Sequence, residues 1–253
     1  MNDALYIAAT GMQAQQLNID TIANNLANVS TSGFKKGRVN FQEMMQVDGG
    51  DAAGQTSPMG LGIGIANFSK DFTVGALTRT GSQMDVAVNG PGFLEVTLSD
   101  GSRGYVRGGT LQVTKDNYLA APNGLVLHPT IHVPPNASML TISADGKVSV
   151  RTSANGTPTD IGQIELSSFA NPAALASLSG GLYTPTESSG DALSARPGSQ
   201  GLGAIEQGAL ENSNVTLVDE MVMLMIAQRA YEMSSKVIQA SDEMMGLTNN
   251  LRR

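Results

Sequence analysis

Apolar residues recur every seven positions at both ends of this 253-residue chain. A seven-residue apolar repeat keeps one face of a helix turned toward a partner helix, so it indicates coiled-coil packing. We therefore predict one helix over about residues 3–28 and another over about residues 214–250. The repeat positions are Leu5, Met12, Ile19 and Leu26 in the first helix, and Leu217, Leu224, Tyr231, Ile238 and Met245 in the second.

The second predicted helix also carries features that bear on its packing. Asn214 or Thr216 can cap its start, and acidic residues follow in the first turn, where they complement the helix dipole. Residues 221–227 are apolar on every face, and such a helix is buried on all sides. The residues three positions after the repeat have mostly small side chains that let a neighbouring backbone approach: Glu220, Ala227, Ser234 and Ser241. Other copies of the chain could bury the apolar surface of this helix. The alternative is that the helix packs on the chain's own β-sheet.

Between the helices the apolar period changes to two, which predicts strands. This region runs from about Ile65 to Phe169, and its Asp100-Gly101 and Asp145-Gly146 pairs predict hairpin turns. Before it, residues 34–46 have the pattern of an extended arm. Residues 47–64 have the Gly- and Ala-rich composition of a flexible linker or loop.

These patterns predict an α+β fold with discontinuous N- and C-terminal helices and an inserted all-β domain. Because both helices leave the same central body, they must run antiparallel if they lie side by side. We expect residues 1–30 and 213–253 to form an antiparallel coiled-coil domain. We expect residues 31–64 and 200–212 to form an extended arm and linker, and residues 65–199 to form the central β domain.

Composition excludes several classes of protein. The net charge of −7 argues against nucleic-acid binding, because phosphate contacts need a basic surface. Without cysteine the chain can form neither a disulfide nor a thiolate metal site. The longest unbroken apolar run, residues 221–227, is far shorter than the ~20 residues of a membrane span. The acidic start also lacks the features of a secretory signal, so we expect neither membrane insertion nor export by that route.

No catalytic, cofactor or metal site is predicted, and we do not expect an enzyme. His128 and His132 lie in a Pro-rich extended segment, where they would stand ~13 Å apart, too far to share one ion. The glycines of residues 60–64 resemble a phosphate loop only weakly, because no strand–loop–helix context surrounds them. Lys35, Lys36 and Arg38 form a short basic cluster that we interpret as a solvated or intersubunit face.

Five segments together resemble the bacterial flagellar rod and hook protein family, in the family's order. They are Ala23–Lys35, Asp85–Phe93, Tyr105–Gly109, Gln207–Val215 and Gln228–Glu232. The family signature residues within the two terminal segments are Asn24, Asn25, Leu26, Ala27, Asn28, Gly33 and Phe34, and Gln228, Arg229, Ala230, Tyr231 and Glu232.

The resemblance implies a structural role. Members of this family leave the cytosol unfolded through the flagellar type III export apparatus and polymerise into a hollow helical shaft that transmits torque. The expected location is the periplasm-spanning rod of the basal body. The expected partners are other copies of the chain, proximal rod and hook subunits and the ring bushing around the rod, with no cofactor. Residues 24–28 are expected to serve both export recognition and packing of the inner tube.

Chain length and residues 5–16 are most like those of distal rod members of the family. Proximal rod members are much shorter and lack a central β domain, and hook subunits are longer, with an additional outer domain. A proximal rod or hook-type subunit is therefore an alternative within the family. An alternative of another class is a self-contained β-domain enzyme or carbohydrate-binding protein, although no site can be named for it.

Overall fold

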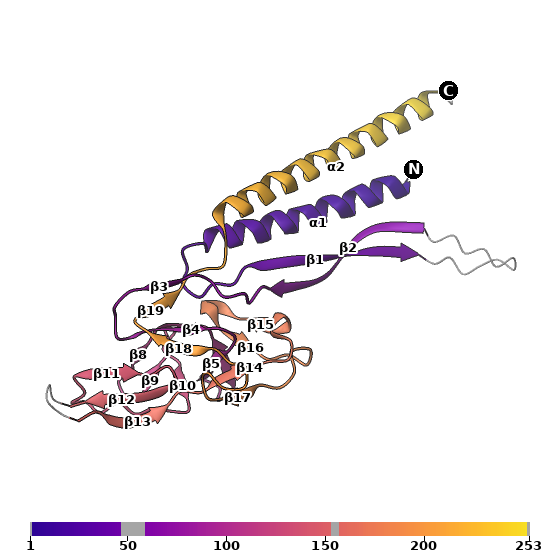
Figure 1. Cartoon of the computed structure of the whole chain (residues 1–253). Coiled ribbons are helices and arrows are strands. Elements are labelled where there is room, and N and C mark those ends of the chain that lie inside the picture. Colours follow the sequence, from indigo (N-terminus) through magenta and orange to yellow (C-terminus); the bar gives the residue numbers. More distant parts are fainter. Residues whose placement is uncertain (1, 47–58, 153–156, 252–253) are drawn as a thin grey trace, which may run out of the picture. The chain divides into compact units, whose positions relative to one another are not determined.

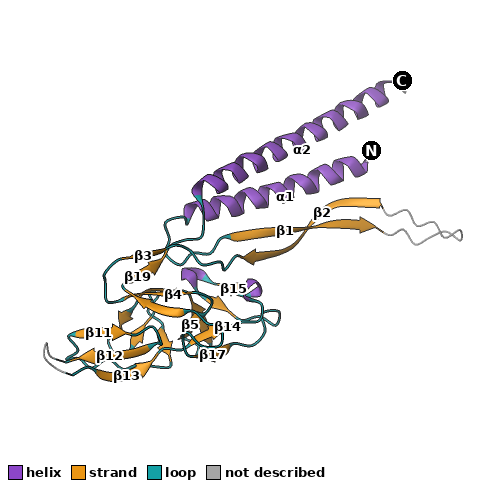
Figure 2. Ribbon diagram, viewed as in Figure 1, coloured by secondary structure: helices purple, strands orange, loops and turns teal. Residues whose placement is uncertain are grey.

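The computed structural model describes residues 2–46, 59–152 and 157–251, and the chain divides into two compact units (Figure 1). The helical unit comprises Met1–Ala27, Gly37–Ser69 and Thr216–Arg253. The β unit comprises Asn28–Lys36 and Lys70–Val215. Each unit therefore combines segments from distant parts of the sequence. The α+β class predicted from the sequence is confirmed, with a helix near each end and strands between them (Figure 2).

The helical unit consists of two helices and a two-stranded sheet. Helix α1 spans Asn2–Ala27 and α2 spans Leu217–Leu251. They pack against each other and run in opposite directions, since Gly11 lies beside Ser234 while Asn25 bonds Glu220 (Figure 1). Strand β1 (Gly37–Gln46) pairs with β2 (Met59–Lys70).

Of the two predicted caps of α2, Thr216 holds the position before the helix. Its Oγ1 donates a hydrogen bond to Asp219 Oδ2 at 2.7 Å, and its carbonyl accepts one from the Glu220 N–H at 3.0 Å. Asn214 does not act as the cap, because its side chain bonds backbone groups of the β unit instead.

The prediction of a flexible segment over residues 47–64 is wrong for its last six residues, which belong to β2. The glycines there allow the strand to pack closely on its neighbours and do not mark a flexible loop. A Cβ atom on Gly62 would clash with Thr10 Oγ1, and Gly62 has a positive φ of 98°. A larger residue at position 62 would push the strand away from α1. Residues 47–58 of the predicted linker lie outside the described residues.

Strand β5 lies at the centre of the largest sheet in the β unit, bonded to β6 on one edge and to β10 and β14 on the other. The strands of this sheet are β5 (Phe93–Thr97), β6 (Arg103–Val106), β8 (Gln112–Val113), β9 (Leu119–Ala120), β10 (Val126–His128), β14 (Leu166–Ser168), β15 (Ala176–Ser177), β16 (Tyr183–Thr184) and β17 (Leu193–Ala195). Two short 3-10 turns, Pro172–Ala174 and Ser179–Gly181, flank β15.

Three smaller sheets complete the described strands. One contains β11 (Met139–Ile142), β12 (Lys147–Arg151) and β13 (Thr159–Gln163); another contains β4 (Asp85–Asn89), β7 (Gly108–Thr110) and β18 (Ala204–Gln207); the last contains β3 (Leu77–Arg79) and β19 (Ala209–Glu211). The predicted hairpins at Asp100-Gly101 and Asp145-Gly146 are confirmed as the β5–β6 and β11–β12 connections.

Residues 200–212, which the sequence assigns to the arm, contain β18 and β19. These strands pair antiparallel with β4 and β3, so the chain is held in two sheets before it reaches α2. The pairing strands are far apart in sequence, and local composition does not report such pairings.

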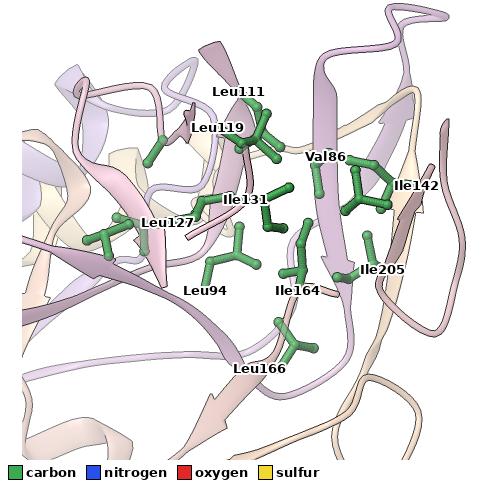
Figure 3. Close-up of a cluster of buried hydrophobic side chains, with 14 of the residues drawn as sticks. Val86, Leu94, Leu111, Leu119, Leu127, Ile131, Ile142, Ile164, Leu166 and Ile205 are labelled. Atoms are coloured by element: carbon green, nitrogen blue, oxygen red, sulfur yellow. The ribbon is translucent and has the colours of Figure 1, made fainter. Parts of the chain in front are cut away.

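Aliphatic side chains from several of these strands fill the interior of the β unit. Figure 3 shows Leu94, Leu127 and Ile131 facing one another, with Ile142, Ile164 and Ile205 beside them. A separate aromatic cluster joins Phe93, Tyr105, Phe169 and Tyr183, with edge-to-face ring contacts between 4.8 and 5.9 Å. Two kinds of apolar core therefore stabilise the β unit.

Candidate assembly surface

The contact between α1 and α2 is built mainly from small side chains. On α2, Ala227 and Ser241 are buried and Ser234 between them is half-buried. A Cβ atom on Gly11 of α1 would lie 3.8 Å from the Ser234 Oγ, which is van der Waals distance. The small-residue positions of α2 therefore face α1 of the same chain, and their size lets the two helices approach closely.

The predicted repeat positions flank this contact. On α1, Leu5, Met12, Ile19 and Leu26 are all half-buried, and on α2 so are Leu224, Ile238 and Met245. Leu217 and Tyr231 are exposed, at 49% and 39%. The most deeply buried positions of α1 are instead Ala8, Ala14, Ile22 and Asn25. Within the single chain, the repeat positions are therefore only partly buried or exposed, and none of them is fully buried.

A long apolar surface remains uncovered on the other side of α2. We call it the outer face of α2, and its side chains are between 43% and 68% exposed: Val218, Met221, Val222, Met223, Met225, Ile226, Met233, Val237 and Leu247. Helix α1 covers one side of the helix that the sequence predicted to be buried on all sides. An exposed apolar surface of this extent marks an interaction site.

The sheet of the helical unit carries a second exposed apolar area. On β1 and β2, the side chains of Phe41, Met44, Met45, Ile63, Ile65 and Phe68 are between 37% and 60% exposed. Tyr6 and Ile7 of α1 are exposed as well, at 53% and 42%. The helical unit therefore presents apolar side chains from all four of its elements, whereas the aliphatic core of the β unit is enclosed.

The signature residue Asn25 connects three elements of the helical unit. Its Oδ1 accepts a hydrogen bond from the Gly37 N–H at 2.8 Å, and its Nδ2 donates to the Gly37 carbonyl at 3.0 Å. The same Nδ2 lies 3.3 Å from Glu220 Oε2 on α2. Asn25 is 3% exposed and Glu220 is 9% exposed, so these polar contacts are almost fully shielded from water.

The neighbouring signature residues lie nearer the surface. Asn24 and Ala27 are exposed, and Leu26 and Asn28 are half-buried. Thr31 closes the turn after α1, because its N–H and Oγ1 donate to the carbonyl and Oδ1 of Asn28 at 3.1 and 3.2 Å. Of the asparagines in this stretch, Asn25 is the most deeply buried.

In the β unit, Lys35 and Arg107 meet at the carboxylate of Glu211. Lys35 Nζ lies 2.6 Å from Glu211 Oε1 and also donates to the Thr73 carbonyl at 2.6 Å. Arg107 Nη2 lies 3.1 Å from Glu211 Oε2, and Arg107 Nε donates to the same oxygen at 3.2 Å. We call these three residues the charge cluster. Their side chains are at most 2% exposed.

Backbone groups complete the charge cluster. The Gly75 N–H donates to Glu211 Oε1 at 2.9 Å, and Arg107 donates to the Gly92 and Gly90 carbonyls at 2.6 and 3.0 Å. Burial lowers the pKa of the Lys35 ammonium, the hydrogen bond with Glu211 raises it, and the Arg107 charge lowers it again, for a net lowering. Every member is hydrogen-bonded, which offsets the removal of these charges from water.

The backbone beside the charge cluster holds two distant segments together. The Gly33 N–H donates to the Glu211 carbonyl at 2.7 Å, and the Lys36 N–H donates to Asn214 Oδ1 at 2.8 Å. The Asn214 N–H donates to the Phe34 carbonyl at 3.4 Å. Residues 33–36 and 211–214 therefore lie side by side in the β unit, a few residues after α1 and a few residues before α2.

Sequence reasoning missed this role of Lys35. The interpretation of Lys35, Lys36 and Arg38 as a solvated or intersubunit face is wrong for Lys35, which is fully buried. Lys36 is half-buried, 3.6 Å from Asp71, and Arg38 is exposed. The available signal was the position of Lys35, Arg107 and Glu211 in three separate signature segments, but nothing local indicates that these segments meet.

The C-terminal signature residues lie on α2. Gln228, Arg229, Tyr231 and Glu232 are exposed, and Ala230 is half-buried. Arg229 Nη1 lies 2.9 Å from Glu232 Oε2, three residues further on. An exposed ion pair of this kind contributes little to the stability of the single chain.

The histidines do not converge. His128 Nε2 lies 3.9 Å from Glu95 Oε1, and His132 bridges to Tyr118 on another segment. Among the described residues, no group of three or more His, Cys, Asp or Glu side chains could hold a metal ion. Neither helix, over its described length, is long and apolar enough to cross a membrane.

Profiles of three protein families match the chain. One described as "flagella basal body rod protein" matches residues 5–35, and one described as "flagellar hook protein FlgE/F/G D1 domain" matches residues 87–150. A third, "flagellar basal body rod FlgEFG protein C-terminal", matches residues 206–251. These matches coincide with the segments that carried the resemblance.

Several curated proteins are similar along their whole length. The chain is 41% identical over 264 residues to the flagellar basal-body rod protein FlgG of Borreliella burgdorferi, with all of both chains covered. It is 40% identical over 254 residues to the protein of that name from Buchnera aphidicola subsp. Schizaphis graminum, covering 97% of this chain and 98% of the relative. The identity to the Bacillus subtilis protein of that name is 37% over 263 residues, with 99% of each covered.

Proposed function

Because this chain belongs to the flagellar basal-body rod protein family, we propose that it is a structural subunit of the distal rod, without enzymatic activity of its own. Full-length similarity to proteins named for the rod supports this assignment. A hook-type subunit is the weaker alternative, because such a chain would carry an additional outer domain. A self-contained binding protein would not need the uncovered outer face of α2.

The outer face of α2 is the observation that carries the proposal. Copies of the chain would bury this face against one another through a contact between different surfaces. Such a contact generates an open helical filament when its rotation does not close a ring. Burial of apolar surface, at roughly 25 cal/mol per Å², would then stabilise the polymer rather than the monomer.

We assign the parts of the chain to layers of a hollow shaft. Residues 1–30 and 213–253 would form an antiparallel coiled-coil domain around the channel. Residues 31–64 and 200–212 would form the layer outside it, and residues 65–199 the outer wall. The exposed apolar side chains of β1 and β2 support a position in which that hairpin is covered by neighbours.

The remaining assignments follow from membership of the family. The subunit would pass through the flagellar type III apparatus, join proximal rod and hook subunits at its ends and turn inside the ring bushing. Residues 24–28 would act both in export and in packing. Replacing Asn24 and Asn28 by Ala, with secretion and rod assembly measured separately, tests that dual role, and normal secretion with normal assembly would contradict it.

A pair of substitutions tests the assembly surface. Ile226→Asp places a charge on the outer face of α2 at a side chain that is 59% exposed. Leu193→Asp is the matched control, because Leu193 is 66% exposed but lies on β17 of the β unit. Each variant would replace the native gene in a flagellated host, and basal bodies would be isolated and examined for the rod.

We expect both purified variants to unfold at the same denaturant concentration as the native chain, because neither side chain is buried. We expect Ile226→Asp to abolish rod assembly and motility, and Leu193→Asp to preserve both. Secretion of the two variants is compared so that a block in export is distinguished from a block in assembly. Normal rods containing Ile226→Asp subunits would overturn the proposed assembly surface.

A further inference from the structure

The packing of α1 on α2 does not by itself define a single alignment of the two helices. Gly11 faces Ser234, and the residues seven positions away on α2 are Ala227 and Ser241, which are also small. A slip of seven residues would move one helix by about 10 Å and still place small and apolar side chains opposite each other. Shape complementarity therefore leaves the slipped alignments open, and another contact must select among them.

Two contacts report the alignment that is present. Asn25 meets Glu220, and Gly11 meets Ser234. Gly11 lies fourteen residues before Asn25 on α1, and Ser234 lies fourteen residues after Glu220 on α2. Both contacts therefore belong to one antiparallel register. Fourteen residues are two full repeats, which is why the apolar pattern remains in phase along this distance.

Asn25 has the chemistry to select this register. Its amide uses the Oδ1 acceptor and an Nδ2 donor on the backbone of Gly37, and Nδ2 also faces Glu220 Oε2. An aspartate of the same shape offers no donor to either partner. Because Asn25 and Glu220 are almost completely buried, water cannot replace a contact that is lost.

We propose that Asn25 and Glu220 form a register lock that specifies the alignment of α1 against α2. A slip that places Asn25 opposite Ala227 removes its carboxylate partner and moves Glu220 beyond Ala27, the last residue of α1. A buried polar group left without a partner shifts an equilibrium by about tenfold to a hundredfold. A polar pair that fixes the register of an otherwise repetitive helix contact is an established physical device.

The slip in the other direction is excluded less strongly by the lock. It would bring Asn18 opposite Glu220 and leave Asn25 opposite position 213, before α2 begins. The lock therefore acts chiefly against the slip that places Asn25 opposite Ala227. The lock acts within the single chain and does not depend on polymerisation.

Disulfide trapping can measure the register, because the native chain contains no cysteine. The double variant Gly11→Cys/Ser234→Cys reports the observed register, and Gly11→Cys/Ser241→Cys reports the slipped one. Both use the same position on α1 and small positions on α2. The full chain is oxidised at high dilution, and the internal cross-link is quantified in the monomer band.

In the native background we expect the first pair to cross-link and the second to remain reduced. Adding Asn25→Asp places a carboxylate against Glu220, so we expect the ratio of slipped to native cross-link to rise at least about tenfold. Adding Glu220→Gln as well lets the new amide at position 220 donate to the new carboxylate at position 25, while the Gly37 carbonyl still lacks the donor that Asn25 supplied. We expect this chain with four substitutions to recover part of the native cross-link, which a loss of packing alone would not do.

Asn18→Asp is the matched control, since Asn18 lies one repeat earlier on α1 and is half-buried. We expect it to leave both cross-links unchanged. An unchanged ratio with Asn25→Asp would overturn the register lock. If Glu220→Gln recovered none of the native cross-link, including through a loss of both cross-links by unfolding, the register lock would be overturned as well.

Discussion

At the residue scale, the charge cluster shows how one carboxylate can organise two distant cations. Glu211 accepts hydrogen bonds from Lys35 and Arg107, which are 176 and 104 residues away in the chain. Apolar periodicity could not identify these contacts. A charged residue is read as a surface position in such a pattern, whether it is buried or exposed in the fold. The cluster becomes visible only once the segments are folded together.

Replacing Glu211 by Gln should strongly destabilise the chain. The substitution keeps the shape but leaves the charges of Lys35 and Arg107 uncompensated in a buried site. We expect the free energy of unfolding to fall by about 3–5 kcal/mol, measured by urea unfolding at neutral pH. Glu206→Gln is the control, since Glu206 pairs at 3.5 Å with Arg79, which is 88% exposed, and we expect a small change. Equal effects of the two variants would contradict the role of the cluster.

Tyr183 predicts a loss of stability at high pH. Burial raises its pKa from 10.0 to about 12, the Arg107 charge lowers it and Glu211 raises it. Because the folded-state pKa lies above the unfolded value, the stabilisation is present below pH 10 and is lost as the pH rises through about 12. The shift corresponds to roughly 3 kcal/mol.

Tyr183→Phe should remove this dependence while preserving the ring contacts with Phe72 and Phe93. We expect the stability difference between about pH 9 and pH 11.5 to be smaller in the variant than in the native chain. Urea unfolding at both pH values measures that difference, and other titrating groups cancel in the comparison. An identical pH dependence in both proteins would refute the prediction.

At the element scale, the helices could be predicted and part of the sheet of the helical unit could not. A seven-residue repeat is a long, redundant signal, so both helices end within a few residues of the predicted bounds. Strand β2 was missed over residues 59–64 because its glycines have the composition of a flexible loop. The packing of Gly62 against α1, and of Gly60 and Gly64 against β1, is a tertiary effect that composition does not contain.

Two glycines in hairpin turns provide a matched comparison at this scale. Gly146 and Gly101 both follow Asp and have φ of 83° and 82°. A Cβ atom on Gly146 would clash with the Ile164 carbonyl and lie 2.9 Å from the Pro197 ring, whereas nothing lies within 4 Å of one on Gly101. We expect Gly146→Ala to lower the melting temperature more than Gly101→Ala, whose effect is limited to backbone strain of about 1–2 kcal/mol. Equal melting temperatures would contradict the close approach.

At the scale of the whole molecule, the family was predicted correctly because its signature segments are spread over most of the chain. The matching profiles and full-length relatives confirm the resemblance. The buried roles of Asn25, Lys35, Arg107 and Glu211 could not be predicted, since each depends on partners supplied by distant segments. The roles of the repeat positions and of the exposed C-terminal signature residues remain predictions for the assembled state.

The two units should differ in stability when the chain is dilute. The helical unit exposes apolar side chains from every element, whereas the β unit encloses its core, so we expect the helical unit to open first. Hydrogen exchange followed by mass spectrometry should show faster exchange in α1 and α2 than in β4 and β5. Raising the protein concentration until it assembles should slow exchange in the helices selectively. Uniform protection at high dilution would contradict this expectation.

The hydrogen bonds between residues 33–36 and 211–214 have a consequence for how such a chain can change over time. The segments of the β unit that follow α1 and precede α2 are paired through their backbones, with the Gly33 nitrogen 2.7 Å from the Glu211 carbonyl oxygen. Loops elsewhere in that unit can lengthen, shorten or acquire whole new modules without moving these paired segments. Natural variation and engineered insertions can therefore alter these loops while the spacing of the two connecting segments stays constant.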